Sequence, residues 1–357
     1  MTGSSRAALA LAVFAAAVQP AATLGAGQSN TIQSFSGGNG WLNGAPLTPA
    51  QLQGKIVLVD FWEYTCINCL RTLPYLREWY RRYRDRGFVI VGVHTPEFNF
   101  SGERANVAAA AKRLGVTWPI VLDDNATIWK RYANNVWPRE LLYDRSGKLV
   151  EDVSGEGGYP ETESKIQAVI KASDPHASLP PVMALLPQDS YDKPGAVCYP
   201  QTAELLVGRH PIANAPGGAN PAQDTNYSYG ASNPPDGAVY LQGYWHLTPE
   251  AAISGERDGY LVLRYHAIAV DVVMKTQAGG AVRVDVAQDG RPIAKADAGP
   301  DLRYDAQGRS YVVVDSPRAY DLLANARFGE HELKLSPKSD GLGIYDVAFE
   351  SCEVPQK

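Results

Sequence analysis

Two cysteines three positions apart stand where a strand pattern gives way to a helix pattern. Residues 56–62 form an apolar run, which predicts a buried strand, and large apolar side chains recur every three or four positions over residues 70–83, which predicts a helix with one apolar face. Cys66 and Cys69 therefore fall on the first turn of that helix. Unpaired N–H groups and the helix dipole favour an anion there, so Cys66 is predicted to form a thiolate that Cys69 can reach to close a disulfide.

Three other uses of the cysteine pair fit the sequence less well. Haem attachment requires a histidine directly after the second cysteine, where this chain has Leu70. A zinc site would need two further ligands at motif spacing, and the remaining cysteines, Cys198 and Cys352, are isolated. A purely structural disulfide within one helical turn would stabilise little, because it closes a very short loop. The pattern favours redox-active thiols that need no metal and no cofactor beyond their own disulfide.

The start of the chain has the pattern of a secretory signal peptide. Arg6 precedes an alanine-rich apolar run that is followed by small residues, so residues 1–26 are predicted to be a signal peptide that is cleaved between Ala22 and Gly27. The protein is then expected to be exported, to a periplasmic or other extracytoplasmic compartment, and to be soluble after cleavage. The alternative is a disordered tail on a cytosolic protein.

The length of 357 residues predicts about two domains, and the composition is that of an ordinary globular protein. Strand and helix patterns over residues 27–173 predict an α/β domain with a mixed central sheet flanked by helices. Residues 174–196 are rich in proline and are expected to form a linker. Short alternating runs over residues 197–357 predict an antiparallel all-β sandwich. A net charge of −5 gives no reason to propose a nucleic-acid partner.

The other two cysteines lie near the two ends of the predicted sandwich. In an exported protein Cys198 and Cys352 are expected to form a structural disulfide between terminal strands. The alternative is a second redox couple.

The first domain resembles thioredoxin over about residues 35–172, and the spacer Ile67-Asn68 together with an extra helix resembles the exported TlpA/DipZ-like branch of that family. The residues that carry the resemblance are Asp60, Phe61, Trp62, Cys66, Cys69, Pro74, Trp137 and Pro138. The resemblance implies a thioredoxin-like fold in which Cys66 is the attacking thiolate and Cys69 the resolving thiol. It also implies that Asp60 is a buried carboxylate that accepts the proton of Cys69 through water.

The resemblance further implies that the client protein meets four residues around the cysteines: Trp62, Thr65, Trp137 and Pro138. Pro138 corresponds to the cis-proline of the family, although sequence alone also allows an ordinary proline at the start of a strand. Burial at the end of a strand should raise the pKa of Asp60 towards the range of a thiol, while a hydrogen-bonded structural aspartate is the alternative. Because the spacer and Thr65 differ from thioredoxin, its reduction potential cannot be transferred.

Two groups of charged residues have an open role. His94 and Glu97 follow the next predicted strand and could touch the cysteine site, or serve only packing and loop solvation. Several arginines on the cysteine-bearing helix, Arg71 among them, are expected to form a solvated face, and a docking face for an acidic partner is the alternative.

The second half resembles the carboxy-terminal jelly-roll module of DipZ-like proteins, which is similar to carbohydrate-binding modules. The segments that carry the resemblance are Trp245 to Glu250, Tyr265 to Ala267, and Asp289-Gly290. Three aromatic residues could stack on a sugar ring or a peptide, or could equally belong to the core: Tyr240, Tyr244 and Trp245. The half is expected to bind or to act as a scaffold.

Together the resemblances imply an exported thiol-disulfide oxidoreductase. It would reduce disulfides of client proteins with electrons from a membrane carrier of the CcdA type, and its second domain could bind carbohydrate. One alternative is a DsbA-like oxidant or isomerase. Another is a non-catalytic adaptor that binds carbohydrate or protein.

Overall fold

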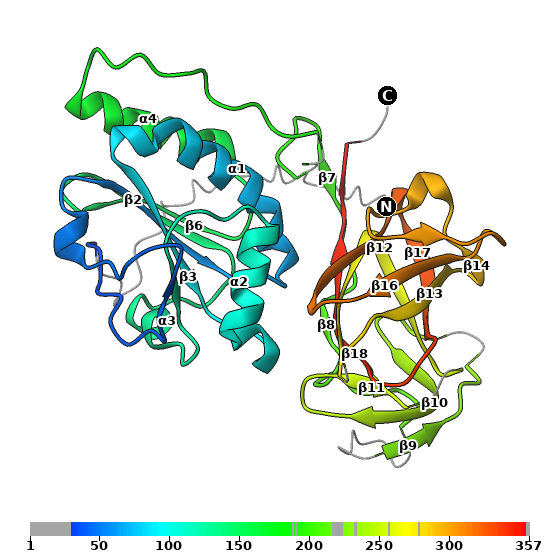
Figure 1. The fold of residues 1–357 in the computed structure, drawn as a ribbon. Coiled ribbons are helices and arrows are strands. Elements are labelled where there is room, and N and C mark those ends of the chain that lie inside the picture. Colours follow the sequence, from blue (N-terminus) through cyan, green and yellow to red (C-terminus); the bar gives the residue numbers. More distant parts are fainter. Residues whose placement is uncertain are drawn as a thin grey trace, which may run out of the picture.

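The computed structural model describes residues 30–187, 189, 191–215, 224–231, 234–255, 258–277 and 279–354. The predicted signal peptide, residues 1–26, lies outside them. An α/β domain and an all-β domain lie side by side, and residues 174–196 run from one to the other (Figure 1). Among the described helices, none is long and apolar enough to cross a membrane.

The first domain is built on a mixed sheet of six strands in the order β1-β4-β3-β2-β5-β6. The strands are β1 (Trp41–Leu42), β2 (Ile56–Trp62), β3 (Phe88–His94), β4 (Ile120–Leu122), β5 (Arg139–Tyr143) and β6 (Leu149–Ser154). Strands β2, β3 and β4 are parallel, whereas β1, β5 and β6 pair antiparallel with their neighbours. This arrangement confirms the predicted mixed sheet.

Helices cover both faces of this sheet. They are α1 (Ile67–Tyr83), α2 (Arg104–Arg113), α3 (Thr127–Arg131) and α4 (Tyr159–Ser173), with short 3₁₀ turns at Pro49–Leu52, Arg84–Arg86 and Asn99–Gly102. Helices α1, α2 and α4 share a hydrophobic core with Ile56 and Leu58, whereas α3 packs with Val57 and Val59 on the opposite face. Because side chains alternate along a strand, Asp60 points to the same face as Ile56 and Leu58, beneath α1.

The second domain consists of antiparallel strands that fold over one hydrophobic core. The strands are β7 (Val197–Cys198), β8 (Leu205–Leu206), β9 (Asp224–Tyr227), β10 (Val239–Leu247), β11 (Ala252–Ser254), β12 (Tyr260–Thr276), β13 (Val282–Gln288), β14 (Arg291–Pro292), β15 (Arg303–Tyr304), β16 (Ser310–Val314), β17 (Arg318–Pro337), β18 (Leu342–Glu350) and β19 (Cys352–Glu353), with a 3₁₀ turn at Lys295–Asp297. The first part of β12 pairs with β10 and its second part with β18, and bulges after Ala267 and Val270 interrupt its ladder with β17. Bulges bend a strand, so the long strands β12 and β17 can change direction and continue along the core.

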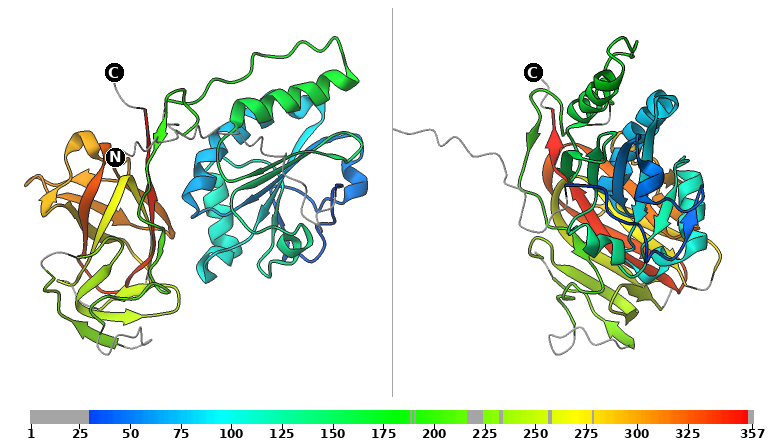
Figure 2. Two further views of the ribbon diagram at one scale, coloured as in Figure 1. Left: turned by 180° about the vertical axis from the view of Figure 1, so that it is seen from behind. Right: turned by 90° about the vertical axis from the view of Figure 1, so that its left-hand side faces the viewer.

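The expected linker is fastened to the first domain instead of running free. Arg86 donates a hydrogen bond to the carbonyl oxygen of Ser178 (2.7 Å), and Glu163 accepts one from the N–H of Met183 (2.7 Å). The hydroxyl of Tyr75 accepts a hydrogen bond from the N–H of Leu186 (2.8 Å). The described residues between 174 and 196 therefore form a strap fastened to α1 and α4, and the left view of Figure 2 shows it beside α4.

The two domains meet beside the amino-terminal half of α1. Phe98 and Phe100 pack edge-on against Tyr345 of β18, with ring centroids 5.4 and 4.8 Å apart. Arg71 of α1 forms an ion pair with Glu350 at the end of β18, with 2.8 Å between nitrogen and oxygen. The second domain is thus docked next to the helix that carries the cysteines.

Candidate active site

The two cysteines face each other across the first turn of α1. Cys66 is the N-cap residue, and its Sγ accepts a hydrogen bond from the N–H of Cys69 at 3.3 Å. The two Sγ atoms are 2.7 Å apart, and no disulfide joins the two cysteines. Cys66 is partly exposed and Cys69 is buried, and burial together with the neighbouring Cys66 raises the pKa of Cys69 well above its usual value. One sulfur can therefore meet a partner while the other is held protonated behind it.

Asp60 lies buried beneath the cysteine turn. The structure gives neither of its carboxylate oxygens a hydrogen-bond partner among the described residues. Burial raises the pKa of Asp60 to about 8, and the Asp60 charge contributes to the raised pKa of Cys69. A carboxyl group whose pKa lies near that of a thiol can exchange a proton with it, which is the chemistry expected of Asp60.

A second buried carboxyl group stands beside Asp60 and was missed from the sequence. Glu140 of β5 is the direct cross-strand partner of Asp60 in β2, so both side chains lie on the same face of the sheet. Burial, followed by the Asp60 charge, raises the pKa of Glu140 well above its usual value. Sequence patterns do not show which residues of two strands lie opposite each other, and only the register of β2 and β5 reveals that the two carboxyl groups adjoin.

Glu63, also missed, holds the loop that leads into the cysteine turn. Its side chain is buried, and its Oε2 atom accepts hydrogen bonds from the N–H of Thr65 (2.5 Å), from the Thr65 hydroxyl and from the N–H of Cys66 (3.0 Å). Its Oε1 atom lies 3.7 Å from Nε2 of His94, whose pKa is lowered to about 3 by burial. His94 is therefore neutral, and it touches the site through Glu63 and not through the cysteines.

The four residues expected to meet a client do not all reach the surface. Trp62 is fully buried against His94, and Thr65 is buried with its hydroxyl bonded to Glu63, so the structure corrects the expectation of direct contact for both. The bond between Trp137 and Pro138 is cis, as in the family to which the motif was compared. Pro138 is buried, whereas Trp137 is partly exposed and packs at the rim of the same core as Cys66.

Glu97 lies near charged groups of both domains. Burial, and then the charge of Glu204, raises the pKa of Glu97 to about 7. Its charge in turn contributes to the raised pKa of Asp346, a buried residue of β18. Glu97 therefore belongs to the boundary between the domains.

The three aromatic residues expected to bind a ligand do not form one surface. Trp245 is fully buried in the core, and its Nε1–H donates a hydrogen bond to the carbonyl oxygen of Gln242 (2.8 Å), so the core alternative holds for Trp245 and direct stacking on a ligand does not. Tyr240 is partly buried against Tyr229, while Tyr244 is 38% exposed. Successive side chains of a strand point to opposite faces, which separates Trp245 from the two tyrosines.

A disulfide joins Cys198 of β7 to Cys352 of β19, which are direct cross-strand partners. It closes the second domain near both of its ends, as the spacing of these cysteines suggested.

Two family models match the chain, one for each domain. The Redoxin family matches residues 28–170, and the family described as thioredoxin-like C-terminal domain matches residues 202–349.

Several characterised proteins are similar to the chain. Protein DipZ of Mycobacterium bovis and of Mycobacterium tuberculosis is 32% identical over 326 residues, which cover 89% of this chain and 43% of DipZ. The chain therefore spans less than half the length of these relatives. The thiol-disulfide oxidoreductase ResA of Bacillus anthracis is 27% identical over 134 residues, or 38% of this chain and 72% of ResA.

Among solved structures, a thioredoxin-like protein in its oxidized form is 25% identical, with a TM-score of 0.36, and the match covers 41% of this chain and 96% of that protein. The similarity to DipZ runs through both domains and so includes the cysteine turn, the cis-proline segment and the second domain. By these matches the chain is DipZ/TlpA-like and similar to thioredoxin-family proteins, because each domain matches a family model of its own and the similarity to DipZ spans both.

Proposed function

We propose that the chain is a thiol-disulfide oxidoreductase that exchanges its Cys66 and Cys69 thiols with disulfides of client proteins. The observation that carries this proposal is the arrangement of a partly exposed Cys66 sulfur 2.7 Å from a buried Cys69 sulfur, above the buried carboxyl group of Asp60. The similarity to ResA and DipZ supports it.

The exchange has two steps. The Cys66 thiolate attacks one sulfur of the client disulfide, and the other client sulfur leaves as a thiolate that takes up a proton. Cys69 then gives its proton to the Asp60 carboxylate and attacks the Cys66 sulfur of the mixed disulfide. The disulfide between Cys66 and Cys69 forms, and the second client sulfur leaves as a thiolate that takes up a proton in its turn. Two electrons pass from the protein to the client, and no separate cofactor takes part.

In this proposal the protein reduces client disulfides in an extracytoplasmic compartment, and a membrane carrier of the CcdA type then restores the dithiol. The predicted signal peptide and the DipZ relationship support that setting. The second domain would hold clients or carbohydrate near the cysteines, and Tyr244 is the exposed aromatic residue for such contact.

The test uses single cysteine variants and a redox titration. Cys69→Ser keeps the attacking sulfur and removes the resolving one, so it should accumulate a mixed disulfide with a disulfide-bonded client, whereas Cys66→Ser should form none. Mass spectrometry after acid quenching reads the adduct. A reduction potential of about −270 mV for the Cys66 and Cys69 couple would support the role of a reductant. A potential near −120 mV would show that the protein is an oxidant instead. Absence of exchange in the wild type would refute the oxidoreductase altogether.

A further inference from the structure

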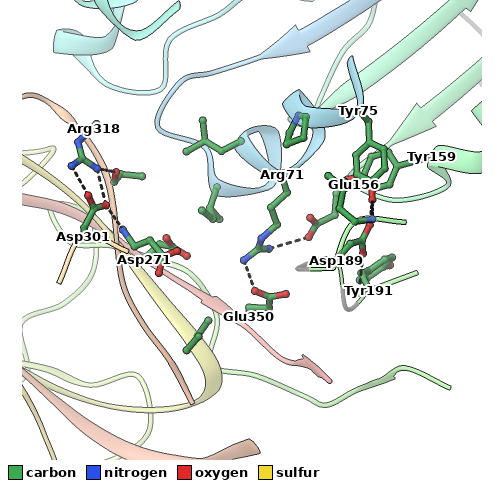
Figure 3. Close-up of a pocket in the computed structure, with 18 of the residues that line it drawn as sticks. Arg71, Tyr75, Glu156, Tyr159, Asp189, Tyr191, Asp271, Asp301, Arg318 and Glu350 are labelled. Atoms are coloured by element: carbon green, nitrogen blue, oxygen red, sulfur yellow. Dashed lines mark hydrogen bonds and ion pairs between the residues drawn. The ribbon is translucent and has the colours of Figure 1, made fainter. Parts of the chain in front are cut away.

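A cavity between the two domains opens directly beside the cysteine turn. It has a volume of about 430 Å³, and Figure 3 draws its lining side chains. One wall belongs to α1 and includes Ile67, the residue that follows Cys66, together with Leu70 and Pro74. The opposite wall belongs to β12 and β17 of the second domain. We call this cavity the interdomain pocket.

The interdomain pocket is rich in negative charge. Its lining has six carboxyl groups and three guanidinium groups: Glu156, Asp189, Asp271, Asp301, Asp321 and Glu350, with Arg71, Arg113 and Arg318. Two of the three arginines are already matched by carboxylates. Arg71 pairs with Glu156 (3.1 Å) and Glu350 (2.8 Å), and Arg318 makes two contacts with Asp301, at 2.6 and 2.8 Å (Figure 3). The carboxyl groups that form none of these ion pairs are Asp189, Asp271 and Asp321.

Asp271 is a buried carboxyl group of the pocket with an unsatisfied oxygen atom. It is 5% exposed, and its Oδ1 atom has no hydrogen-bond partner within the described part of the chain. Its cross-strand partner is Asp321 of β17, so two carboxyl groups adjoin on one face. Burial, and then the Asp321 charge, raise the pKa of Asp271 well above its usual value, and they outweigh the nearby Arg71 charge, which lowers it. A buried carboxyl group of this kind is stabilised by a positive charge that comes close to it.

The rest of the lining suits a long side chain with a charged end. Alanine, leucine, isoleucine and proline side chains line both walls: Ile67, Leu70, Pro74, Ala269, Ala319 and Ala324. Tyr75 and Tyr159 stack with ring centroids 3.7 Å apart at another side of the pocket. Methylene stems of lysine and arginine pack on apolar surface, and their cationic ends are attracted to carboxylates and aromatic faces.

We propose that the interdomain pocket binds a lysine or arginine side chain of the client protein, at a position close to the client's disulfide. This inference rests on the proposed function, because it names the class of client that the same cysteines would serve. Ile67 lines the pocket and adjoins Cys66 in sequence, so a client segment whose disulfide meets Cys66 places its neighbouring residues at the pocket.

The experiment compares two disulfide-bonded peptides that differ at one residue next to the cysteine, lysine in one and glutamine in the other. The wild type should reduce the lysine peptide with a kcat/KM about tenfold higher, as expected for one charge-assisted contact. Asp271→Asn should bring the ratio close to one. Asp85→Asn is the matched control, because the Asp85 side chain is 90% exposed and lies away from the pocket, and it should keep the wild-type ratio.

The ratio is taken within one preparation of each variant, so a loss of folded protein cancels. Asp321→Asn provides a second variant of the same site and should also lower the ratio. Equal rates for both peptides in the wild type, or an unchanged ratio in both aspartate variants, would overturn the pocket assignment while leaving the oxidoreductase in place. Failure to reduce either peptide would instead count against the proposed function.

Discussion

The Oε2 atom of Glu63 accepts a hydrogen bond from the N–H of Cys66, with 3.0 Å between oxygen and nitrogen. The same oxygen also serves both donors of Thr65, so one buried carboxyl group fixes the backbone just ahead of the attacking sulfur. The position of Cys66 therefore depends on a residue three positions upstream that does not itself face a client.

Replacing Glu63 should lower the free energy of unfolding, and the loss should grow with the number of donors left without an acceptor. Glu63→Ala leaves three buried donors without their partner, and each such loss costs about 1–3 kcal/mol, so the free energy of unfolding should fall by roughly 3 kcal/mol or more. Glu63→Gln retains a carbonyl oxygen and should lose about 1 kcal/mol. Urea denaturation of the reduced protein measures both. Equal losses in the two variants would contradict the role of Glu63 as an acceptor.

Asp60→Asn should slow the second step of the exchange. The amide cannot take the proton of Cys69, so release of the client from the mixed disulfide should slow by about 100-fold, the size usual for loss of a general base. The first attack by Cys66 should change little. Stopped-flow measurement with a dye-labelled disulfide peptide separates the two phases. A slow first phase with an unchanged second phase would assign Asp60 a different role.

Asp60 should also make stability depend on pH. Its pKa is about 8 when folded and 3.8 when unfolded, so between these values the unfolded chain binds fewer protons and the free energy of unfolding falls as pH rises. The slope reaches about 1.4 kcal/mol per pH unit for one group. From pH 5 to pH 8 the wild type should therefore lose up to about 4 kcal/mol more than Asp60→Asn. Parallel curves for the two proteins in urea denaturation at several pH values would refute this.

Arg71 should matter more than its neighbours on α1. Its side chain is 24% exposed and joins Glu156 of the first domain to Glu350 of the second, so Arg71→Ala leaves two carboxylates without their cation. Partial exposure limits the cost to about 1–3 kcal/mol. Arg81→Ala is the control: the Arg81 side chain is 68% exposed, so removing it should leave the stability nearly unchanged. Limited proteolysis should cut Arg71→Ala faster between the domains, and equal cutting of both variants would argue against the bridge.

The disulfide between Cys198 and Cys352 should stabilise the second domain without taking part in exchange. It closes a sequence separation of 154, for which chain entropy sets a ceiling of roughly 5 kcal/mol. The double variant Cys198→Ser/Cys352→Ser should unfold at lower urea concentration and still reduce clients through Cys66. Alkylation of Cys198 and Cys352 in step with Cys66 during a redox titration would make this pair a second couple.

The parts of the site that lie close together in the sequence were predicted from it. Strand, cysteine turn and helix follow one another between residues 56 and 83, so local patterns suffice to place Asp60, Cys66 and Cys69. Glu140 was not found because its proximity to Asp60 depends on the register of two strands that are far apart in the chain. Glu63 was not found because its burial results from packing of the whole domain around the loop.

In the second domain the strand pattern decides between the two alternatives for Trp245. Val239, Leu241, Trp245 and Leu247 occupy alternate positions of β10 and are all buried, so strand periodicity alone assigns Trp245 to the core. The expectation of a solvated arginine face failed at Arg71 for a different reason. One of its two carboxylate partners, Glu350, lies 279 positions away, and no local pattern in α1 indicates that another domain docks there.

The strap formed by residues 174–196 sets how far the second domain can move. Near its end Asp192 is fastened to the first domain, since its side chain accepts a hydrogen bond from the N–H of Gly158 at 2.6 Å, and β7 begins at Val197. Even fully extended, the chain between Asp192 and Val197 spans less than about 20 Å. A second domain that lifts away to admit a client thus stays at a high effective concentration near its docking surface. Weak contacts between the domains are then enough to close them again after each turnover.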